Sequence, residues 1–210
     1  MRHLKMGLTA ALAAMALIAF VGAGTASAGE LWKSIEWWDE TQKVGATLEA
    51  SKQLGSTVLF EDTNGKKFNE CTGVGLSLLI ERAGENNSSF WHPNGSVQSH
   101  TYTGCSKTVD TIMGGKWEII NVPGTANGLF VSTGTEVTVT HEIFGVSCVY
   151  KTPTPGITTG TLTGNEEIGG TTTLDINGPL SGTSGGACPA SARLTATYTV
   201  TNIKGLYVAD

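Results

Sequence analysis

The sequence lacks the features on which several large classes of protein depend. It has 13 Lys and Arg against 18 Asp and Glu, and its basic residues do not cluster, so it is a poor candidate for binding nucleic acid or an anionic membrane. Beyond residue 28 it has no apolar run long enough to span a bilayer. It also lacks C-x-x-C and H-x-x-x-H spacings, so we predict no metal site and no cofactor.

The first 28 residues have the pattern of an export signal. Basic residues at 2–5 precede an apolar stretch at 7–24, and the small residues 26–28 (Ala-Ser-Ala) form a cleavage site. We therefore expect residues 1–28 to be removed, and the mature chain to be secreted or held at the cell envelope without a transmembrane segment. An uncleaved membrane anchor is the alternative.

Four widely spaced cysteines predict two disulfide bonds in an exported chain. They are Cys71, Cys105, Cys148 and Cys188. Three pairings are open, and we favour Cys71 with Cys105 and Cys148 with Cys188. Each of these would close a loop of about 35 to 41 residues and stabilise the fold by roughly 3 to 4 kcal/mol.

The segment 29–42 is rich in aromatic residues and differs from the rest of the chain. Leu31, Trp32, Ile35 and Trp38 recur at helical spacing, which predicts one short amphipathic helix over 31–42.

From residue 43 onward the apolar positions alternate with polar ones, which is typical of β-strands with one buried face. Asn-Gly pairs at 64–65, 94–95 and 177–178 predict tight hairpin turns. Ten or eleven short strands without intervening helices indicate an antiparallel sandwich or barrel. We predict a β-sandwich, Ig-like or jelly-roll, as one domain over 43–210. Two tandem sandwiches meeting near 121–124 are the alternative.

Two patterns leave a hydrolase open as an alternative function. Residues 182–186 (Gly-Thr-Ser-Gly-Gly) resemble the nucleophile loop of trypsin-like serine proteases, which would make Ser184 the nucleophile, with His92 and Asp110 in the order that a triad needs. Carboxylates at Glu36 and Asp39, beside two tryptophans, could serve glycoside hydrolysis. Neither pattern has the surrounding motif of its family, so we predict a protein without catalytic activity.

Aromatic residues near chain turns are the predicted binding residues. Trp37 and Trp38 lie in the aromatic segment, and Trp91 and His92 precede an expected hairpin tip. Aromatic faces stack on sugar rings and on apolar protein surfaces. We therefore predict a polysaccharide or protein of the cell envelope as the partner. The alternative is that these side chains only pack against the rim of the fold. A subunit of an envelope assembly is a further alternative function, which we expect if Trp32, Ile35 and Trp38 form an exposed apolar stripe.

Several short motifs together resemble a group of small exported β-sandwich proteins of bacteria, most of them uncharacterised. The motifs are 71–73 (Cys-Thr-Gly), 102–105 (Tyr-Thr-Gly-Cys), 187–189 (Ala-Cys-Pro) and the alternating strand at 192–200. A fainter similarity is to secreted bacterial proteins linked to biofilm and alkane growth. The resemblance implies export and an all-β fold, not a reaction. A sandwich presents loops at two rigid ends, and the chain has no nucleophile, base and orienting residue at recognisable spacing, so we predict a binding or structural role at the cell surface or outside the cell.

Overall fold

The protein is an all-β structure in the residues that the computed structural model describes, which are 30–34, 39–84, 92–111, 114–141, 146–183 and 188–209. No helix occurs in these ranges. The strands are β1 (Glu30–Ser34), β2 (Asp39–Thr41), β3 (Thr47–Lys52), β4 (Val58–Asp62), β5 (Lys67–Arg82), β6 (Asn94–Cys105), β7 (Thr108–Thr111), β8 (Lys116–Asn121), β9 (Gly128–Thr133), β10 (Glu136–His141), β11 (Val146–Lys151), β12 (Ile157–Thr163), β13 (Thr173–Gly182), β14 (Ser191–Val200) and β15 (Leu206–Ala209).

The main sheet closes on itself, so the expected sandwich is wrong. Eight strands form a ring in the order β14, β4, β5, β6, β8, β9, β12 and β13, and β13 then pairs with β14 from Thr173 opposite Thr199 to Ser181 opposite Ser191. A sandwich and a barrel both bury one face of every strand, so the two folds share the same alternation. The pairing of β14 both with β13 and with the distant strand β4 distinguishes them, and it replaces the Ig-like or jelly-roll architecture with a closed antiparallel barrel.

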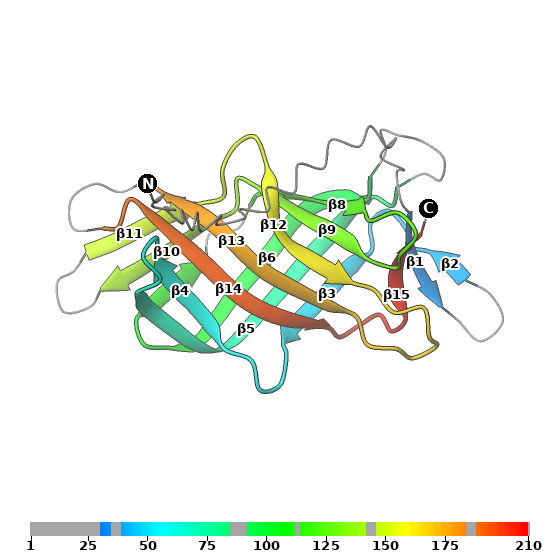
Figure 1. Ribbon diagram of the computed structural model, residues 1–210, viewed down its shortest axis with the longest axis horizontal. Coiled ribbons are helices and arrows are strands. Elements are labelled where there is room, and N and C mark those ends of the chain that lie inside the picture. Colours follow the sequence, from blue (N-terminus) through cyan, green and yellow to red (C-terminus); the bar gives the residue numbers. More distant parts are fainter. Residues whose placement is uncertain are drawn as a thin grey trace, which may run out of the picture.

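The barrel wall is continued at one end by a second set of strands. Along the chain, β9 is followed by β10 after a break at 134–135, and β11 is followed by β12 after a break at 152–156. β11 pairs with β10 and with the end of β13, and β7 pairs with the other side of β10. Figure 1 shows β10 and β11 at one end of the long axis, while β5, β6, β13 and β14 run diagonally along the molecule.

A small three-stranded sheet of β15, β1 and β2 lies at the opposite end (Figure 1). Leu31, Leu206 and Val208 are fully buried there, and the Leu31 amide donates to the carbonyl of Ala83 at 3.1 Å. The predicted helix over 31–42 is therefore wrong, since β1 and β2 occupy its described residues. β1 pairs with the C-terminal strand β15, which gives its backbone groups hydrogen-bond partners and buries Leu31. The spacing of residues within 31–42 carries no information on this distant strand.

Of the three predicted Asn-Gly turns, only the one at 64–65 joins two strands. Gly65 has φ +75° between β4 and β5, whereas Gly95 and Gly178 lie inside β6 and β13. A Cβ at Gly95 would lie 1.8 Å from the carbonyl oxygen of Leu79, and one at Gly178 would lie 2.7 Å from Cβ of Thr159. These two glycines therefore permit close packing rather than a turn.

Both disulfides form with the favoured pairing, Cys71 with Cys105 and Cys148 with Cys188. The first joins neighbouring strands β5 and β6 beside the β6–β7 turn. Buried Asn69 holds this turn: its Oδ1 accepts from the amide of Lys107 at 2.9 Å and from the hydroxyl of Ser106 at 2.8 Å. Nowhere in the described ranges does a helix occur that could cross a membrane.

Candidate functional site

The barrel interior contains a cavity of about 50 Å³ beside the breaks in its wall. Where β9 passes into β10 and β11 into β12, the lining includes Thr135 and Thr152. The rest of the lining is mainly apolar and comes from strands all around the barrel. Its larger apolar side chains are Leu76, Val97, Phe130, Val137, Leu180 and Leu194. An eight-stranded barrel is just wide enough either to be filled by side chains or to hold one small ligand.

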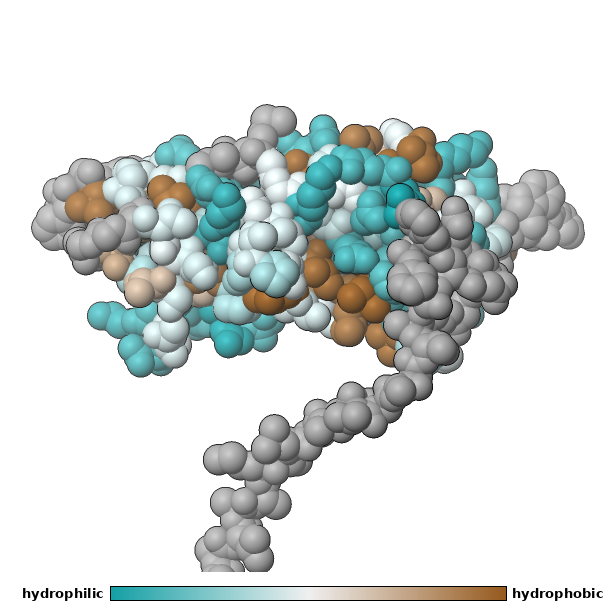
Figure 2. Space-filling model, turned by 90° about the horizontal axis from the view of Figure 1, so that it is seen from above, coloured by the Kyte–Doolittle hydropathy of each residue, from teal (hydrophilic) through white to brown (hydrophobic). Residues whose placement is uncertain are grey.

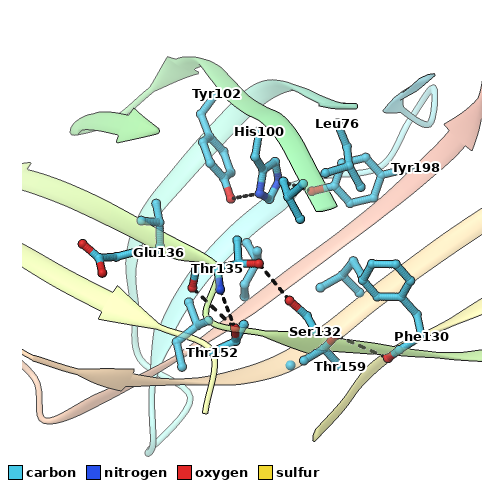
Figure 3. A pocket seen from close by; sticks show the side chains of 16 residues that line it. Leu76, His100, Tyr102, Phe130, Ser132, Thr135, Glu136, Thr152, Thr159 and Tyr198 are labelled. Carbon is cyan, nitrogen blue, oxygen red and sulfur yellow. Dashed lines mark hydrogen bonds between the residues drawn. The ribbon is translucent and has the colours of Figure 1, made fainter. Parts of the chain in front are cut away.

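One side of the cavity carries a hydrogen-bonded chain of three side chains. His100 and Tyr102 are on the inner face of β6, and Tyr198 reaches them from β14, on the far side of the interior (Figure 3). His100 Nε2 lies 2.6 Å from the Tyr198 hydroxyl, and His100 Nδ1 lies 3.2 Å from the Tyr102 hydroxyl. We call this chain the Tyr102–His100–Tyr198 relay.

All members of the relay are held in their uncharged forms. Burial lowers the pKa of His100 to about 4 from its ordinary value of 6.5. Burial raises the pKa of the Tyr102 phenol well above its usual range, with a smaller contribution from neighbouring Tyr198, and it raises the pKa of Tyr198 in the same way. An uncompensated charge is costly in an apolar interior, so at neutral pH the relay offers the cavity neutral hydrogen-bonding groups.

A second polar group faces the relay from the break in the wall (Figure 3). The hydroxyls of Ser132 and Thr135 lie 2.9 Å apart. The Thr152 hydroxyl accepts from the amide of Thr135 at 2.9 Å, and the Thr152 amide donates to the carbonyl of Thr135 at 2.9 Å. These contacts hold the two crossing segments together and leave the hydroxyls of Ser132 and Thr135 on the cavity wall.

The edge of the cavity reaches the surface at Glu136. Its side chain is 29% exposed, and its carboxylate lies 3.6 Å from Nζ of Lys151 on β11. This ion pair is partly solvated, so it contributes little to stability. Its carboxylate places a negative charge at the edge of the cavity, which disfavours an anionic occupant.

The predicted binding residues do not form this cavity. Trp37, Trp38 and Trp91 lie outside the described residues, so their role stays a prediction. His92 is described: it precedes β6, is partly buried, and its Nδ1 has no hydrogen-bond partner in the described structure. The stretch of β6 from Asn94 to His100 is roughly 20 Å long, which separates His92 from the relay.

The residues considered for hydrolysis are not brought together in the described ranges. Ser184, Glu36 and residues 1–28, the predicted export signal, lie outside these ranges, as does the side chain of Asp39. Asp110 is on β7, at the opposite end of β6 from His92, roughly 30 Å away along the strand. His92 and Asp110 therefore have the order of a triad in the sequence but lie too far apart in the structure to form one.

The sequence pattern gave a weak signal for the residues that line the cavity. The alternation of Leu194, Ala196, Tyr198 and Val200 places Tyr198 on an apolar strand face, and this face is buried. A polar aromatic residue on a predicted inner face needs a hydrogen-bond partner when it is buried. The identity of that partner, His100, depends on the closure of the barrel.

Comparison with known proteins adds no assignment: no protein-family model, no curated protein and no solved structure matches the chain. Within the described part of the chain, no three His, Cys, Asp or Glu side chains form a group that could hold a metal ion. Fold and cavity thus define a disulfide-bonded antiparallel β-barrel with an internal cavity that is mainly apolar, with two neutral polar groups inside and the carboxylate of Glu136 at its edge.

Proposed function

We propose that the protein is an exported binding protein without catalytic activity, which takes a small, uncharged and largely apolar group into the cavity of its barrel. The observation that carries the proposal is the combination of an apolar lining with the buried Tyr102–His100–Tyr198 relay. Ligand sites are commonly apolar hollows with a few well-placed polar groups that fix orientation.

The state of His100 supports binding rather than acid–base chemistry. Both ring nitrogens contact phenol hydroxyls, and burial holds the pKa of the imidazole at about 4. An efficient general acid or base has a pKa near the working pH. The two disulfides are compatible with an oxidising compartment, which supports export to the cell surface or beyond.

The cavity volume limits what can enter. About 50 Å³ is roughly a third of an engineered cavity of about 150 Å³ that accepts benzene. A group of two or three heavy atoms binds no more tightly than about the millimolar range, since small ligands gain at most about 1.5 kcal/mol per heavy atom. We therefore expect the natural ligand to place one slender end in the cavity and to extend past Glu136 onto the surface.

A thermal-unfolding screen of small uncharged molecules tests the proposal. A probe at ten times its dissociation constant should stabilise the folded state by about 1.4 kcal/mol, which raises the unfolding midpoint by about 3 to 6 °C. Acetate and methylammonium serve as charged probes of similar size, and neither should raise the midpoint.

Two matched variants locate the effect. Val137→Leu adds one methylene to the cavity lining, whereas Val131→Leu makes the same change on the outward-facing side of β9. Only Val137→Leu should abolish the stabilisation by the probes. If the probes stabilise both variants equally, binding in the barrel is contradicted. If they stabilise none of the three proteins, binding in the barrel is contradicted as well.

A further inference from the structure

The relay contains one more proton than its hydrogen bonds use. Tyr102 and Tyr198 each carry one O–H, and a neutral His100 carries one N–H. Two hydrogen bonds join the three side chains. Since a neutral imidazole donates once and accepts once, the unused proton belongs to the phenol that accepts from His100.

The two distances identify that phenol. A hydroxyl donor forms shorter hydrogen bonds than an N–H donor, with typical values of about 2.7 Å and about 2.9 Å. The 2.6 Å contact therefore has Tyr198 O–H donating to Nε2, and the 3.2 Å contact has Nδ1–H donating to the Tyr102 oxygen. The O–H of Tyr102 makes no further hydrogen bond within the described structure.

Tyr102 is well placed to use this proton. Its side chain lines the internal cavity, with its hydroxyl at the His100 end (Figure 3). It also lines a second, more open hollow at the β6–β7 turn, together with Ser106 and Lys107. Tyr102 therefore lies between the enclosed cavity and the end of the barrel.

We infer that Tyr102 donates the hydrogen bond that orients the ligand, so that the site selects an uncharged molecule with an acceptor oxygen, such as a ketone, ester or ether. This inference rests on the proposed function, because it specifies the chemistry of the same cavity. The hydroxyls of Ser132 and Thr135 can each donate or accept, so they do not discriminate between ligands in this way. In the relay, the O–H of Tyr102 is the one donor hydrogen that no relay partner uses, so a ligand with an acceptor oxygen gains a hydrogen bond there that an apolar group of the same shape does not.

The tautomer of His100 tests the proton arrangement without any ligand. A long-range proton–nitrogen correlation spectrum of the oxidised, ¹⁵N-labelled protein distinguishes a protonated ring nitrogen from a bare one. Protonated Nδ1 and bare Nε2 are expected. The reverse pattern would give the unused proton to Tyr198 and overturn the assignment to Tyr102.

Dimethyl ether and propane form a matched pair of probes for the ligand class. They have similar bent shapes and three heavy atoms each, but only dimethyl ether carries an acceptor oxygen. Methyl resonances of Val97 and Val137 report binding of each probe to the unaltered protein and to Tyr102→Phe. The variant should bind dimethyl ether about three- to tenfold more weakly, the equivalent of one net hydrogen bond, and should bind propane within about twofold of the unaltered protein.

Tyr150→Phe is the control, because it removes a buried phenol hydroxyl that has no hydrogen-bond partner in the described structure. It should leave both affinities unchanged. If Tyr102→Phe weakens both probes equally or neither of them, the assignment to Tyr102 is wrong while the cavity remains the binding site. If neither probe binds the unaltered protein, the proposed function fails and this inference fails with it.

Discussion

Acidification should destabilise the barrel through His100. Burial holds the pKa of His100 at about 4 in the folded protein, against 6.5 for an ordinary histidine. Between these two values the unfolded chain binds a proton that the folded protein does not bind, so the free energy of unfolding falls as the pH is lowered from 6.5 to about 4. Below about pH 4 both states are protonated and this contribution changes no further.

The size of the effect follows from the same two values. Each pKa unit is worth about 1.4 kcal/mol, so His100 accounts for a loss of about 3 kcal/mol between pH 7 and pH 4. The groups that share its cavity do not offset the loss. Burial keeps Tyr102 and Tyr198 neutral by raising their pKa values, and Glu136 lies at the cavity edge beside Lys151.

Urea unfolding at pH 7, 6, 5 and 4 measures this loss in the unaltered protein and in His100→Gln. Glutamine offers a donor and an acceptor but does not titrate in this range. Carboxylates contribute equally to both curves, so the difference between the curves isolates His100. A difference that shrinks by about 3 kcal/mol from pH 7 to pH 4 is expected, and a difference independent of pH would refute the buried, neutral imidazole.

Three further outcomes follow from single contacts. Asn69→Ala should lower the free energy of unfolding by about 2 to 4 kcal/mol, because it leaves buried groups of the β6–β7 turn unpaired. The control, Asn64→Ala at an exposed position, should change the free energy of unfolding by less than about 0.5 kcal/mol. Equal effects of the two substitutions would contradict the role of Asn69. Tyr150→Phe should leave the free energy of unfolding in urea unchanged or raise it, since the phenol hydroxyl has no hydrogen-bond partner in the described structure. A decrease of more than about 1 kcal/mol would indicate a hydrogen bond that the structure does not show. Replacing Cys148 and Cys188 together by Ser should lower the unfolding free energy by about 4 kcal/mol for the loop of 40 residues, and an unchanged urea midpoint would contradict the stabilising role of this disulfide.

The strands themselves were largely predictable from the sequence. Alternation predicts strands from residue 43 onward, and strands such as β11 (Val146–Lys151) and β12 (Ile157–Thr163) follow it, because each buries one face against a core. The closure of the sheet was not predictable, since it depends on pairing β14 with the distant strand β4 and on the breaks at 134–135 and 152–156. Local patterns carry no information on which strands meet after such breaks.

Glycine and aromatic residues were the main sources of error. Gly95 and Gly178 stand in Asn-Gly pairs that usually mark turns, but here they allow the backbone of Leu79 and the side chain of Thr159 to approach closely. The aromatic segment has helical spacing, yet β1 pairs with a strand about 175 residues away. Where the local spacing favours a helix and a distant strand is available for pairing, the tertiary contacts determine which structure forms.

The candidate site was the least predictable part of the protein. His100, Tyr102 and Tyr198 come from two strands separated by nearly a hundred residues, and no short motif marks them. Their meeting depends on the curvature of the closed sheet. The exposed apolar side chains, by contrast, are few: Val44, Leu54 and Ile168 are the most exposed, and apolar residues form separate small areas on the face seen in Figure 2.

The measurement that tests the account most directly is a set of intermolecular nuclear Overhauser effects from bound dimethyl ether to the methyl groups and aromatic rings of the oxidised protein. Contacts to Val97, Val137 and the ring of Tyr102 are expected, because these side chains line the cavity. Contacts to Val44, Leu54 or Ile168 instead would show that the probe binds exposed apolar residues, and would contradict the barrel interior as the binding site.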